Sequence, residues 1–515
     1  MTDTSIMQRP FTSMSALVRG HAASQPAHAA LVHNERSMSY GELDAIMTRI
    51  GAALQRDGVQ AGGTIAICAT SSIEYAAVYL GAIRAGVVVA PLAPSSTAQS
   101  LAGMVADAGA SIFFVDAAVA EALQPVLPQL GATRLVTLDN SAAGQTFQSW
   151  LAPAGTPFAE PEVRPELPLN IIYSSGTTGV PKGIVQSHGM RWAHVSRGAM
   201  TGYGTDAVTL LSTPLYSNTT LASFFPTIGL GGTAVLMSKF DAGKYLELAQ
   251  RHRVTHTMLV PVQYQRLMAH PDFDKYDLSS YKRKFCTSAP FSAALKAEVV
   301  RRWPGKLTEL YGMTEGGGGC LLHVDEFPDK LHTVGRPAPG ADVRIIDENG
   351  KELPPGSTGE VVGRSAAMMN GYHNLPAKSA EIEWHDAEGN RFIRTGDIGR
   401  FDEDGFLVLM DRMKDVIISG GFNIYPSDIE AVVRTHEAVA DVSVVGVPSE
   451  SWGETPVGFI ALREGHDVTA QAVLAWANER LGKTQRLSAL HIVDTLPRSA
   501  IGKVLKRELR DRITA

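Results

Sequence analysis

The chain has little cysteine, no excess of positive charge and no long apolar run, and each absence excludes a class of protein. Its three cysteines, Cys68, Cys286 and Cys320, are too widely spaced for a disulfide framework or a CxxC zinc site. A formal net charge of −6 over 515 residues gives no overall basic footprint for binding a nucleic-acid backbone. We therefore expect reduced, buried cysteines and no nucleic-acid partner.

Signals for export or membrane insertion are also missing. Residues 1–10 lack the short apolar core of a secretory signal. The most apolar stretch, residues 75–92, is interrupted by Arg84 and by glycines, so it predicts a buried helix followed by a strand and no membrane span. We expect a cytoplasmic protein.

The composition and length predict a globular protein of more than one domain. Hydrophobic residues make up 44% and charged residues 19% of the chain, as in ordinary globular proteins. Short β-branched runs alternate with helical patterns over the first 300 or so residues, which is typical of a mainly parallel sheet covered on both faces. The strands expected on this pattern are residues 64–68, 111–115, 233–237 and 306–310. A capping box, Ser39 to Glu42, predicts a helix over residues 43–54.

The pattern changes in the last third of the chain. Turn signals such as Asn349-Gly350 and Asp404-Gly405 predict a β-rich layer over residues 334–410. Beyond Asp411 the chain returns to mixed helix and strand, with a second capping box predicted from Ser427 to Glu430. The fold class expected is α/β, with a large domain at 1–413 and a small mobile α+β domain at 414–515 that meet near Lys414.

A loop suited to phosphate binding follows a predicted buried strand at residues 170–173. Glycines allow close backbone approach, hydroxyls donate hydrogen bonds and a lysine supplies positive charge. The residues concerned are Ser174, Ser175, Gly176, Thr177, Thr178, Gly179 and Lys182. The spacing is not GxxxxGK[ST], which argues against a P-loop nucleotidase. A flexible surface turn is the alternative for this composition.

The loop resembles the signature of the adenylate-forming superfamily, which contains acyl-CoA synthetases, aryl-CoA ligases, luciferases and peptide-synthetase adenylation domains. The resemblance continues in order along essentially the whole chain. The matching segments are residues 174–183, 288–290, 311–315, 395–397, 411–415, 420–423 and 497–503. An unrelated fold would have to match all of them by chance.

The resemblance implies a ligase that uses ATP, Mg²⁺ and CoA. A carboxylate would attack the α-phosphate of ATP to form an acyl-AMP, whose AMP then leaves when CoA forms a thioester. Negative charge gathers around the α-phosphate in that transition state, so fixed cations and Mg²⁺ should stabilise it. A small carboxylic acid, ATP and CoA are therefore the expected partners, and the motifs leave the oligomeric state open, a homodimer included.

The resemblance also implies roles for single residues of the nucleotide site. Tyr311 would flank the adenine, Thr314 would contact phosphate and Glu315 would be the Mg²⁺ ligand. Asp397 and Arg412 would hold the ribose. The other expected ATP-binding residues are Ser288, Ala289, Pro290, Glu309, Gly312 and Met313. The plain alternatives are a solvated Glu315, a turn aspartate at 397 and a surface ion pair at Arg412.

In the C-terminal part, the resemblance implies that Lys503 bridges the acid and the α-phosphate, a role that suits a flexible point charge. A rotation about Lys414 would then replace Lys503 with the segment around Gly420 and Gly421, where a pantetheine arm has space. For CoA itself, Trp452 resembles an aromatic against the adenine and Arg486 a cation for the phosphate. The alternatives are a plain glycine turn and a tryptophan that covers a domain surface.

Several outcomes stay open at this level. Transfer to CoA is favoured over transfer to a carrier protein or light emission, and a non-enzymatic nucleotide-binding relative is the alternative from another class. The acid-binding residues expected are Tyr216, Ser217, Asn218, Thr219, Gly312 and Gly317. The polar run 217–219 favours a short or branched, hydroxylated acid, unless it only caps a helix starting near Leu221. A hydroxycinnamate or benzoate type of acid is the alternative, because glycines 316–319 leave room for a ring.

Overall fold

The computed structural model describes residues 11–174, 181–419, 422–499 and 502–514. The chain divides into two compact units. The first contains Met1–Leu331, Ala338–Asp342 and Arg364–Ile393, and the second contains His332–Pro337, Val343–Gly363 and Arg394–Ala515. The predicted boundary near Lys414 lies inside the second unit and stays a prediction. In the described ranges, no helix has the length and apolar character needed to cross a membrane.

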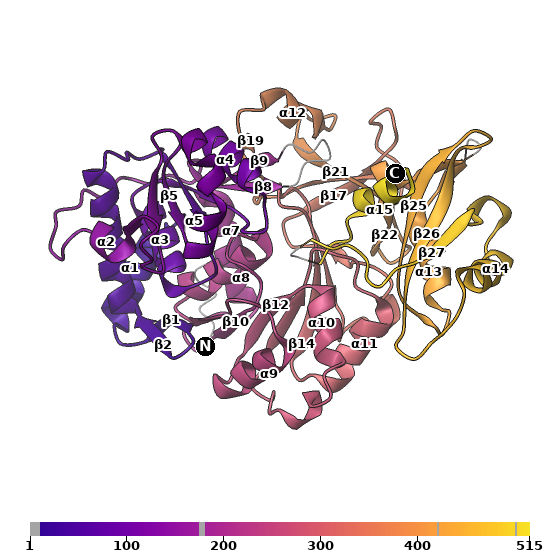
Figure 1. Cartoon of the computed structure of the whole chain (residues 1–515), viewed down its shortest axis with the longest axis horizontal. Helices are drawn as coiled ribbons and strands as arrows, with labels where there is room; N and C mark the ends of the chain where they lie inside the picture. Colours follow the sequence, from indigo (N-terminus) through magenta and orange to yellow (C-terminus); the bar gives the residue numbers. More distant parts are fainter. Residues whose placement is uncertain (1–10, 175–180, 420–421, 500–501, 515) are drawn as a thin grey trace. The chain divides into compact units, whose positions relative to one another are not determined.

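One sheet of the first unit has the strand order β15-β14-β13-β12-β10-β11-β1-β2. Its parallel strands are β1 (Ala29–His33), β10 (Val208–Leu211), β11 (Thr233–Leu236), β12 (His256–Leu259), β13 (Arg283–Cys286) and β14 (Lys306–Tyr311). Two antiparallel strands, β15 (Cys320–His323) and β2 (Arg36–Ser39), pair with β14 and β1. The helices α9 (Ala242–Arg251), α10 (Pro261–Met268) and α11 (Ala293–Arg302) connect the parallel strands β11, β12, β13 and β14 (Figure 1).

The second sheet of this unit has the order β19-β9-β8-β4-β3-β5-β6-β7. Its strands are β3 (Thr64–Cys68), β4 (Val88–Pro91), β5 (Ala110–Val115), β6 (Arg134–Thr137), β7 (Gln145–Thr146), β8 (Pro168–Ser174), β9 (Lys182–Ser187) and β19 (Gly371–Tyr372). From β8 to β7 the pairs are parallel, whereas β8, β9 and β19 are antiparallel. The mainly parallel sheet predicted for the first 300 residues is thus confirmed.

Helices cover both faces of this sheet. Ile65 and Ile67 of β3 lie in one apolar cluster with the helices α1 (Met14–Ser24), α2 (Tyr40–Arg56), α3 (Ile73–Arg84), α7 (His188–Met200) and α8 (Asn218–Gly229). The alternate residues Ala66 and Cys68 lie in a second cluster with α4 (Ala98–Asp107) and α5 (Ala117–Ala122). Successive side chains of a strand point to opposite faces, so one strand contributes to both cores. The shorter helices are α6 (Phe147–Trp150) and α12 (Pro376–Glu381). All three cysteines are buried and free, as expected.

Two sheets make up most of the second unit. The first has the order β17-β18-β21 with β22 paired to β21. The start of β21, residues 391–393, belongs to the first unit, where it pairs with β20 (Glu383–His385). These strands are β17 (Asp342–Ile346), β18 (Gly359–Arg364), β21 (Arg391–Phe401) and β22 (Leu407–Arg412), which confirms the predicted β-rich layer. The second has the order β24-β23-β26-β25, with β27 parallel to β26.

The C-terminal sheet packs against helices at its surface. Its strands are β23 (Ile417–Ser419), β24 (Phe422–Ile424), β25 (Val439–Ser449), β26 (Gly453–Leu462) and β27 (Ala489–Ile492), and the helices are α13 (Pro426–Arg434), α14 (Ala470–Arg480) and α15 (Lys506–Thr514). Ile429 of α13, Val473 of α14 and Ile460 of β26 are fully buried in one cluster. The mixed helix and strand predicted beyond Asp411 is confirmed.

The two predicted capping boxes have different outcomes. Ser39 and Glu42 form both reciprocal bonds at the start of α2, so the first is confirmed. The second is wrong, because α13 has Tyr425 at its N-cap and no side-chain capping bond. Ser427 instead donates its hydroxyl to the Met410 carbonyl, and its backbone N–H donates to Asp411 at 2.9 Å. A tertiary contact with β22 thus takes the serine that local spacing assigned to the helix.

Candidate active site

Three predicted site segments follow parallel strands of one sheet in the first unit. Residues 216–219 lie beyond β10, residues 288–290 follow β13 and residues 312–317 follow β14. Because β10, β12, β13 and β14 run parallel, their carboxyl ends meet at one edge, where open α/β sheets bind ligands. The Thr219 and Ser288 hydroxyls hydrogen-bond at 2.6 Å and join two of these segments.

Ser288 has a strained backbone at this edge. Its φ is 81°, in the left-handed region that a non-glycine residue adopts at a cost on the order of 1–3 kcal/mol. Its neighbour Ala289 is half-buried and Pro290 is exposed. The bond from Thr219 helps to hold this conformation, which turns the chain sharply just beyond β13.

The predicted acid-binding segment opens α8. Ser217 is buried and occupies the N-cap position, but it makes no side-chain capping bond, and the helix begins at Asn218 instead of near Leu221. The capping alternative is therefore wrong for Ser217. Among the residues that the structure describes, its hydroxyl has no hydrogen-bond partner, whereas Asn218 accepts from Gln186 at 3.2 Å. Tyr216 is half-buried, and burial raises its pKa.

The predicted phosphate loop joins the antiparallel strands β8 and β9. Ser174 and Lys182 are register partners at its two ends. Five of the predicted residues, Ser175, Gly176, Thr177, Thr178 and Gly179, lie outside the described residues. The Lys182 ammonium is 5.2 Å from the centroid of the Tyr372 ring, within the range of a cation–π contact.

Tyr372 links this lysine to the predicted metal ligand. Its hydroxyl donates to Glu315 Oε1 at 2.8 Å. Burial, followed by the Glu315 charge, raises the Tyr372 pKa, so the phenol remains a proton donor at neutral pH. Glu315 is thus held as an oriented, half-buried acceptor, and the alternative of a merely solvated acid does not describe it.

The donor set around Glu315 fits Mg²⁺ shared with phosphates. In the described part of the chain, no group of three His, Cys, Asp or Glu side chains could hold a metal by itself. A lone carboxylate oxygen suits Mg²⁺, which takes its other ligands from substrate phosphates and water. A single carboxylate does not provide the several protein ligands that a zinc site requires.

Residues 315–317 are fixed by backbone contact with residues 367–369. The Met369 N–H donates to the Glu315 carbonyl at 2.8 Å, and the Gly317 N–H donates to the Ala367 carbonyl at 3.2 Å. Gly316 has φ +78°, and a Cβ there would lie 1.8 Å from the Ala367 oxygen. Close backbone approach therefore requires glycine at 316 and places the neighbouring Glu315.

The remaining predicted residues of this segment differ in burial. Tyr311 is half-buried and Gly312 is exposed, while Met313 packs against the apolar cluster around Ile184. Glu309 is only 4% exposed and forms an ion pair with Lys296 of α11 at 2.5 Å. Burial raises the Glu309 pKa to about 7 although Lys296 opposes the shift. Its predicted contact with ATP stays a prediction.

In the second unit, the predicted ribose and lysine residues lie together. Asp397 and Arg412 are register partners on β21 and β22, and their side chains form an ion pair at 3.2 Å. Arg412 therefore does form an ion pair, as the alternative to a ribose contact expected, and its partner is the other predicted ribose residue, Asp397. Burial lowers the Lys503 pKa to about 8, and the charges of Arg412 and Lys414 act in the same direction.

The described residues predicted to bind CoA do not contact one another. Trp452, just before β26, is 61% exposed, and Arg486 is also exposed. Gly420 and Gly421 lie outside the described residues. Within the described ranges, no hydrogen bond or ring contact joins Trp452 to Arg486, so their role stays a prediction.

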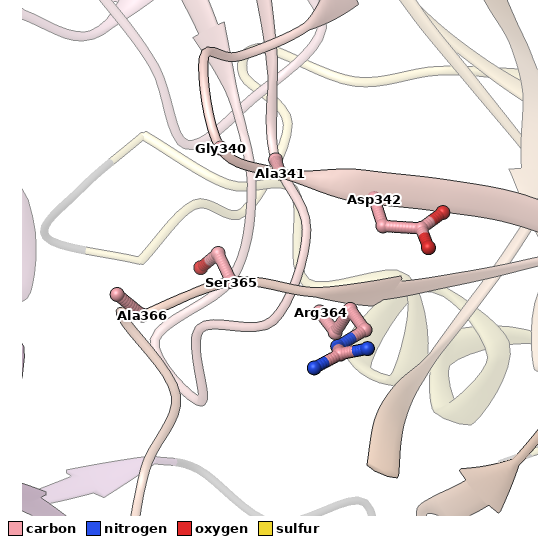
Figure 2. A pocket seen from close by; sticks show the side chains of 6 residues that line it. All are labelled: Gly340, Ala341, Asp342, Arg364, Ser365 and Ala366. Carbon is pink, nitrogen blue, oxygen red and sulfur yellow. The ribbon is translucent and has the colours of Figure 1, made fainter. Parts of the chain in front are cut away.

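A hollow of about 440 Å³ in the first unit is lined by none of these residues. Figure 2 shows its lining, which is Gly340, Ala341, Asp342, Arg364, Ser365 and Ala366. The Ser365 hydroxyl at its edge donates to the Gly317 carbonyl. No predicted site residue lines the hollow, so we do not assign it to the reaction.

Sequence reasoning missed the residues that support the site. Tyr372 lies 57 residues from the Glu315 that it contacts, and no local pattern marks it. Asn170 and Gln186 had a weak signal, because each is a polar residue within an otherwise apolar strand. Both are fully buried, and both hydrogen-bond to Arg191 of α7.

Comparison with known proteins identifies the relatives of this chain. The profile of the AMP-binding enzyme family matches residues 18–373, and that of the AMP-binding enzyme C-terminal domain matches residues 428–503. A feruloyl-CoA synthase of an Amycolatopsis species is 32% identical, with 95% of this chain and 97% of that protein covered. The fatty acid–[acyl-carrier-protein] ligase ScoC of Streptomyces coeruleorubidus is 30% identical, with 96% and 95% covered. The structure of ATP-bound MatB from Rhodopseudomonas palustris matches with a TM-score of 0.87 at 28% identity, with 97% and 99% covered.

Proposed function

Because this chain belongs to the AMP-binding enzyme family, we propose that it is an AMP-forming acid–CoA ligase acting on a short, branched or hydroxylated acid. In the first step a carboxylate and ATP give acyl-AMP and pyrophosphate, and in the second step CoA gives acyl-CoA and AMP. The observation that carries the proposal is the Lys182–Tyr372–Glu315 arrangement, which sets a cation and an oriented carboxylate beside the phosphate loop.

The residues of the first unit serve the triphosphate and the acid. Glu315 would hold Mg²⁺, which neutralises phosphate charge when it is bound. Lys182 provides a fixed positive charge at the end of the phosphate loop, and the Thr314 hydroxyl provides a phosphate donor. Water exclusion around this edge would strengthen each of these electrostatic interactions.

The residues of the second unit serve the ribose and the reacting carboxylate. The Asp397 carboxylate accepts hydrogen bonds from ribose hydroxyls, and Arg412, its ion-pair partner, orients it. Lys503 bridges the acid and the α-phosphate, and with a pKa of about 8 it is mostly protonated at pH 7. Its movement away through a hinge at Lys414 makes room for CoA.

The preference for a hydroxylated acid rests on Ser217. Ser217 is only 7% exposed, and its hydroxyl has no hydrogen-bond partner among the described residues, while Thr219 is bonded to Ser288 and Asn218 to Gln186. A bound acid would cover this hydroxyl and remove its water, so an acid whose own hydroxyl pairs with Ser217 would be favoured over the deoxy analogue, which leaves the serine unpaired.

An aromatic acid is the second candidate, favoured by the 32% identity to a feruloyl-CoA synthase. The glycines 316 and 317, which the sequence associates with space for a ring, also have a backbone reason. Both have positive φ, and Gly316 lies against the Ala367 carbonyl. The relationship therefore supports an aromatic acid more strongly than these glycines do.

Pyrophosphate release tests the reaction. The purified protein is given ATP and Mg²⁺ with a panel of acids, with and without CoA, and both acyl-CoA and AMP are measured. We expect acid-dependent pyrophosphate release and CoA-dependent thioester. Release without thioester would indicate another acceptor, and absence of release with every acid class would contradict ligase activity.

A matched pair of variants tests the acid. Ser217→Ala should lower kcat/KM for a hydroxy acid about tenfold or more and leave the deoxy analogue unchanged. Thr227→Val is the control, because Thr227 is on the same helix and donates to the Ser223 carbonyl at 2.7 Å inside the core. Preference of the native protein for aryl or long-chain acids would reject the short hydroxylated acid.

A further inference from the structure

Helix α7 carries a buried arginine that has no carboxylate partner among the residues that the structure describes. Arg191 of α7 is fully buried. Among the described residues, no Asp or Glu forms an ion pair with it. Its guanidinium donates to Asn170 Oδ1 from two nitrogens, each at 3.3 Å, and also to Gln186 Oε1. A buried charge is costly, so its retention at this position points to a role in the site.

Gln186 connects this arginine to both substrate segments. Its Oε1 accepts from Arg191 and from Asn170 Nδ2, the latter at 2.9 Å. Its Nε2 donates to the Thr314 carbonyl at 2.7 Å and to Asn218 Oδ1 at 3.2 Å. All five residues belong to the first unit. One side-chain amide therefore joins β9, the segment that carries Glu315 and the start of α8.

The arginine determines which way this amide points. A guanidinium has donors only, so every group that faces it must present an acceptor. Gln186 must turn its oxygen toward Arg191, and its NH₂ must then point toward Thr314 and Asn218. A neutral donor and acceptor in place of Arg191 would permit either orientation.

We propose that Gln186, oriented by Arg191 and Asn170, is a positioning residue that fixes the Thr314 carbonyl and Asn218 for adenylation. It acts through its neighbours and touches no substrate. The inference rests on the proposed function, because the segment that it fixes is the one assigned to phosphate, Mg²⁺ and the acid.

Gln186→Glu separates positioning from stability. The new carboxylate still accepts from Arg191 and Asn170, and it compensates the arginine charge, but it has no NH₂ for the Thr314 carbonyl. We expect an unfolding temperature close to that of the native protein. Adenylation kcat should fall about tenfold to hundredfold, because misplacement by about 1 Å has effects of that size. KM for ATP should change less than kcat.

Arg191→Met and Arg84→Met form a matched pair. Both arginines are fully buried in the first unit, but Arg84 has a carboxylate partner, Asp44, at 2.5 Å and is bonded to Ser15 and Thr48. We expect both changes to lower the unfolding temperature. At a temperature where both variants are folded, only Arg191→Met should lower kcat.

Hydrogen exchange of residues 312–319 gives a readout independent of turnover. Exchange should be faster in Gln186→Glu and Arg191→Met and unchanged in Arg84→Met. Native kcat and native exchange in Gln186→Glu, or an equal kcat loss in Arg84→Met, would overturn the inference. If the native protein releases no pyrophosphate with any acid, the proposed function fails, while the exchange data still decide whether Gln186 orders this segment.

Discussion

Gly316→Ala should disable adenylation through backbone geometry alone. Gly316 has φ +78°, and an added Cβ would lie 1.8 Å from the Ala367 oxygen. Carbon and oxygen atoms in close contact are normally about 3.3 Å apart, so the two backbone segments would have to separate by about 1.5 Å. The bonds of Glu315 with Met369 and of Gly317 with Ala367 would break or lengthen.

The size of the effect follows from two contributions. A non-glycine residue in the left-handed region costs roughly 1–2 kcal/mol, and overpacking adds roughly 1–3 kcal/mol. Gly389→Ala is the control, because Gly389 has φ +80° and open space around its Cβ position. We expect the free energy of unfolding of Gly389→Ala to fall only by the cost of the left-handed backbone, without the overpacking contribution.

Activity should respond more than stability does. A shift of about 1 Å in the Glu315 carboxylate would lower adenylation about hundredfold. The assay is acid-dependent pyrophosphate release, measured where denaturation curves show that both variants are folded. Adenylation by Gly316→Ala within about threefold of Gly389→Ala would refute the close approach as the reason for glycine at this position.

Other predictions concern lysines. Lys503→Ala should lower adenylation at least about hundredfold yet spare thioester formation from a supplied acyl-AMP, and equal loss in both half-reactions would contradict its role. Only the protonated Lys503 carries charge and its pKa is about 8, so the adenylation rate should decline as pH rises through about 8. Lys503→Arg should remove that decline, because arginine stays protonated. Identical pH profiles of the two proteins would reject the assignment. Lys414→Pro should spare adenylation and block thioester formation, and normal overall turnover would exclude Lys414 as the hinge. Lys296→Met leaves Glu309 buried without its partner and should lower the free energy of unfolding by about 3–5 kcal/mol. Adding Glu309→Gln should restore most of that loss. A double variant as unstable as Lys296→Met alone would contradict the pairing.

Local patterns in the sequence determined the elements and the order of the motifs. The alternation of β3 places Ile65 and Ile67 on one face and Ala66 and Cys68 on the other, as a period of two requires. The capping box at Ser39 is equally local, because both its bonds join residues three apart. These features follow from neighbouring residues, and sequence alone can therefore predict them.

Tertiary structure decided which polar groups meet. Ser427 has the spacing of a helix cap but bonds to β22, and the Gln186 amide reaches Thr314, which is 128 residues away along the chain. Tyr372 reaches Glu315 only because residues 367–369 lie against the segment after β14. A buried polar group must find a partner wherever the packed chain provides one, and topology rather than spacing determines where that partner lies.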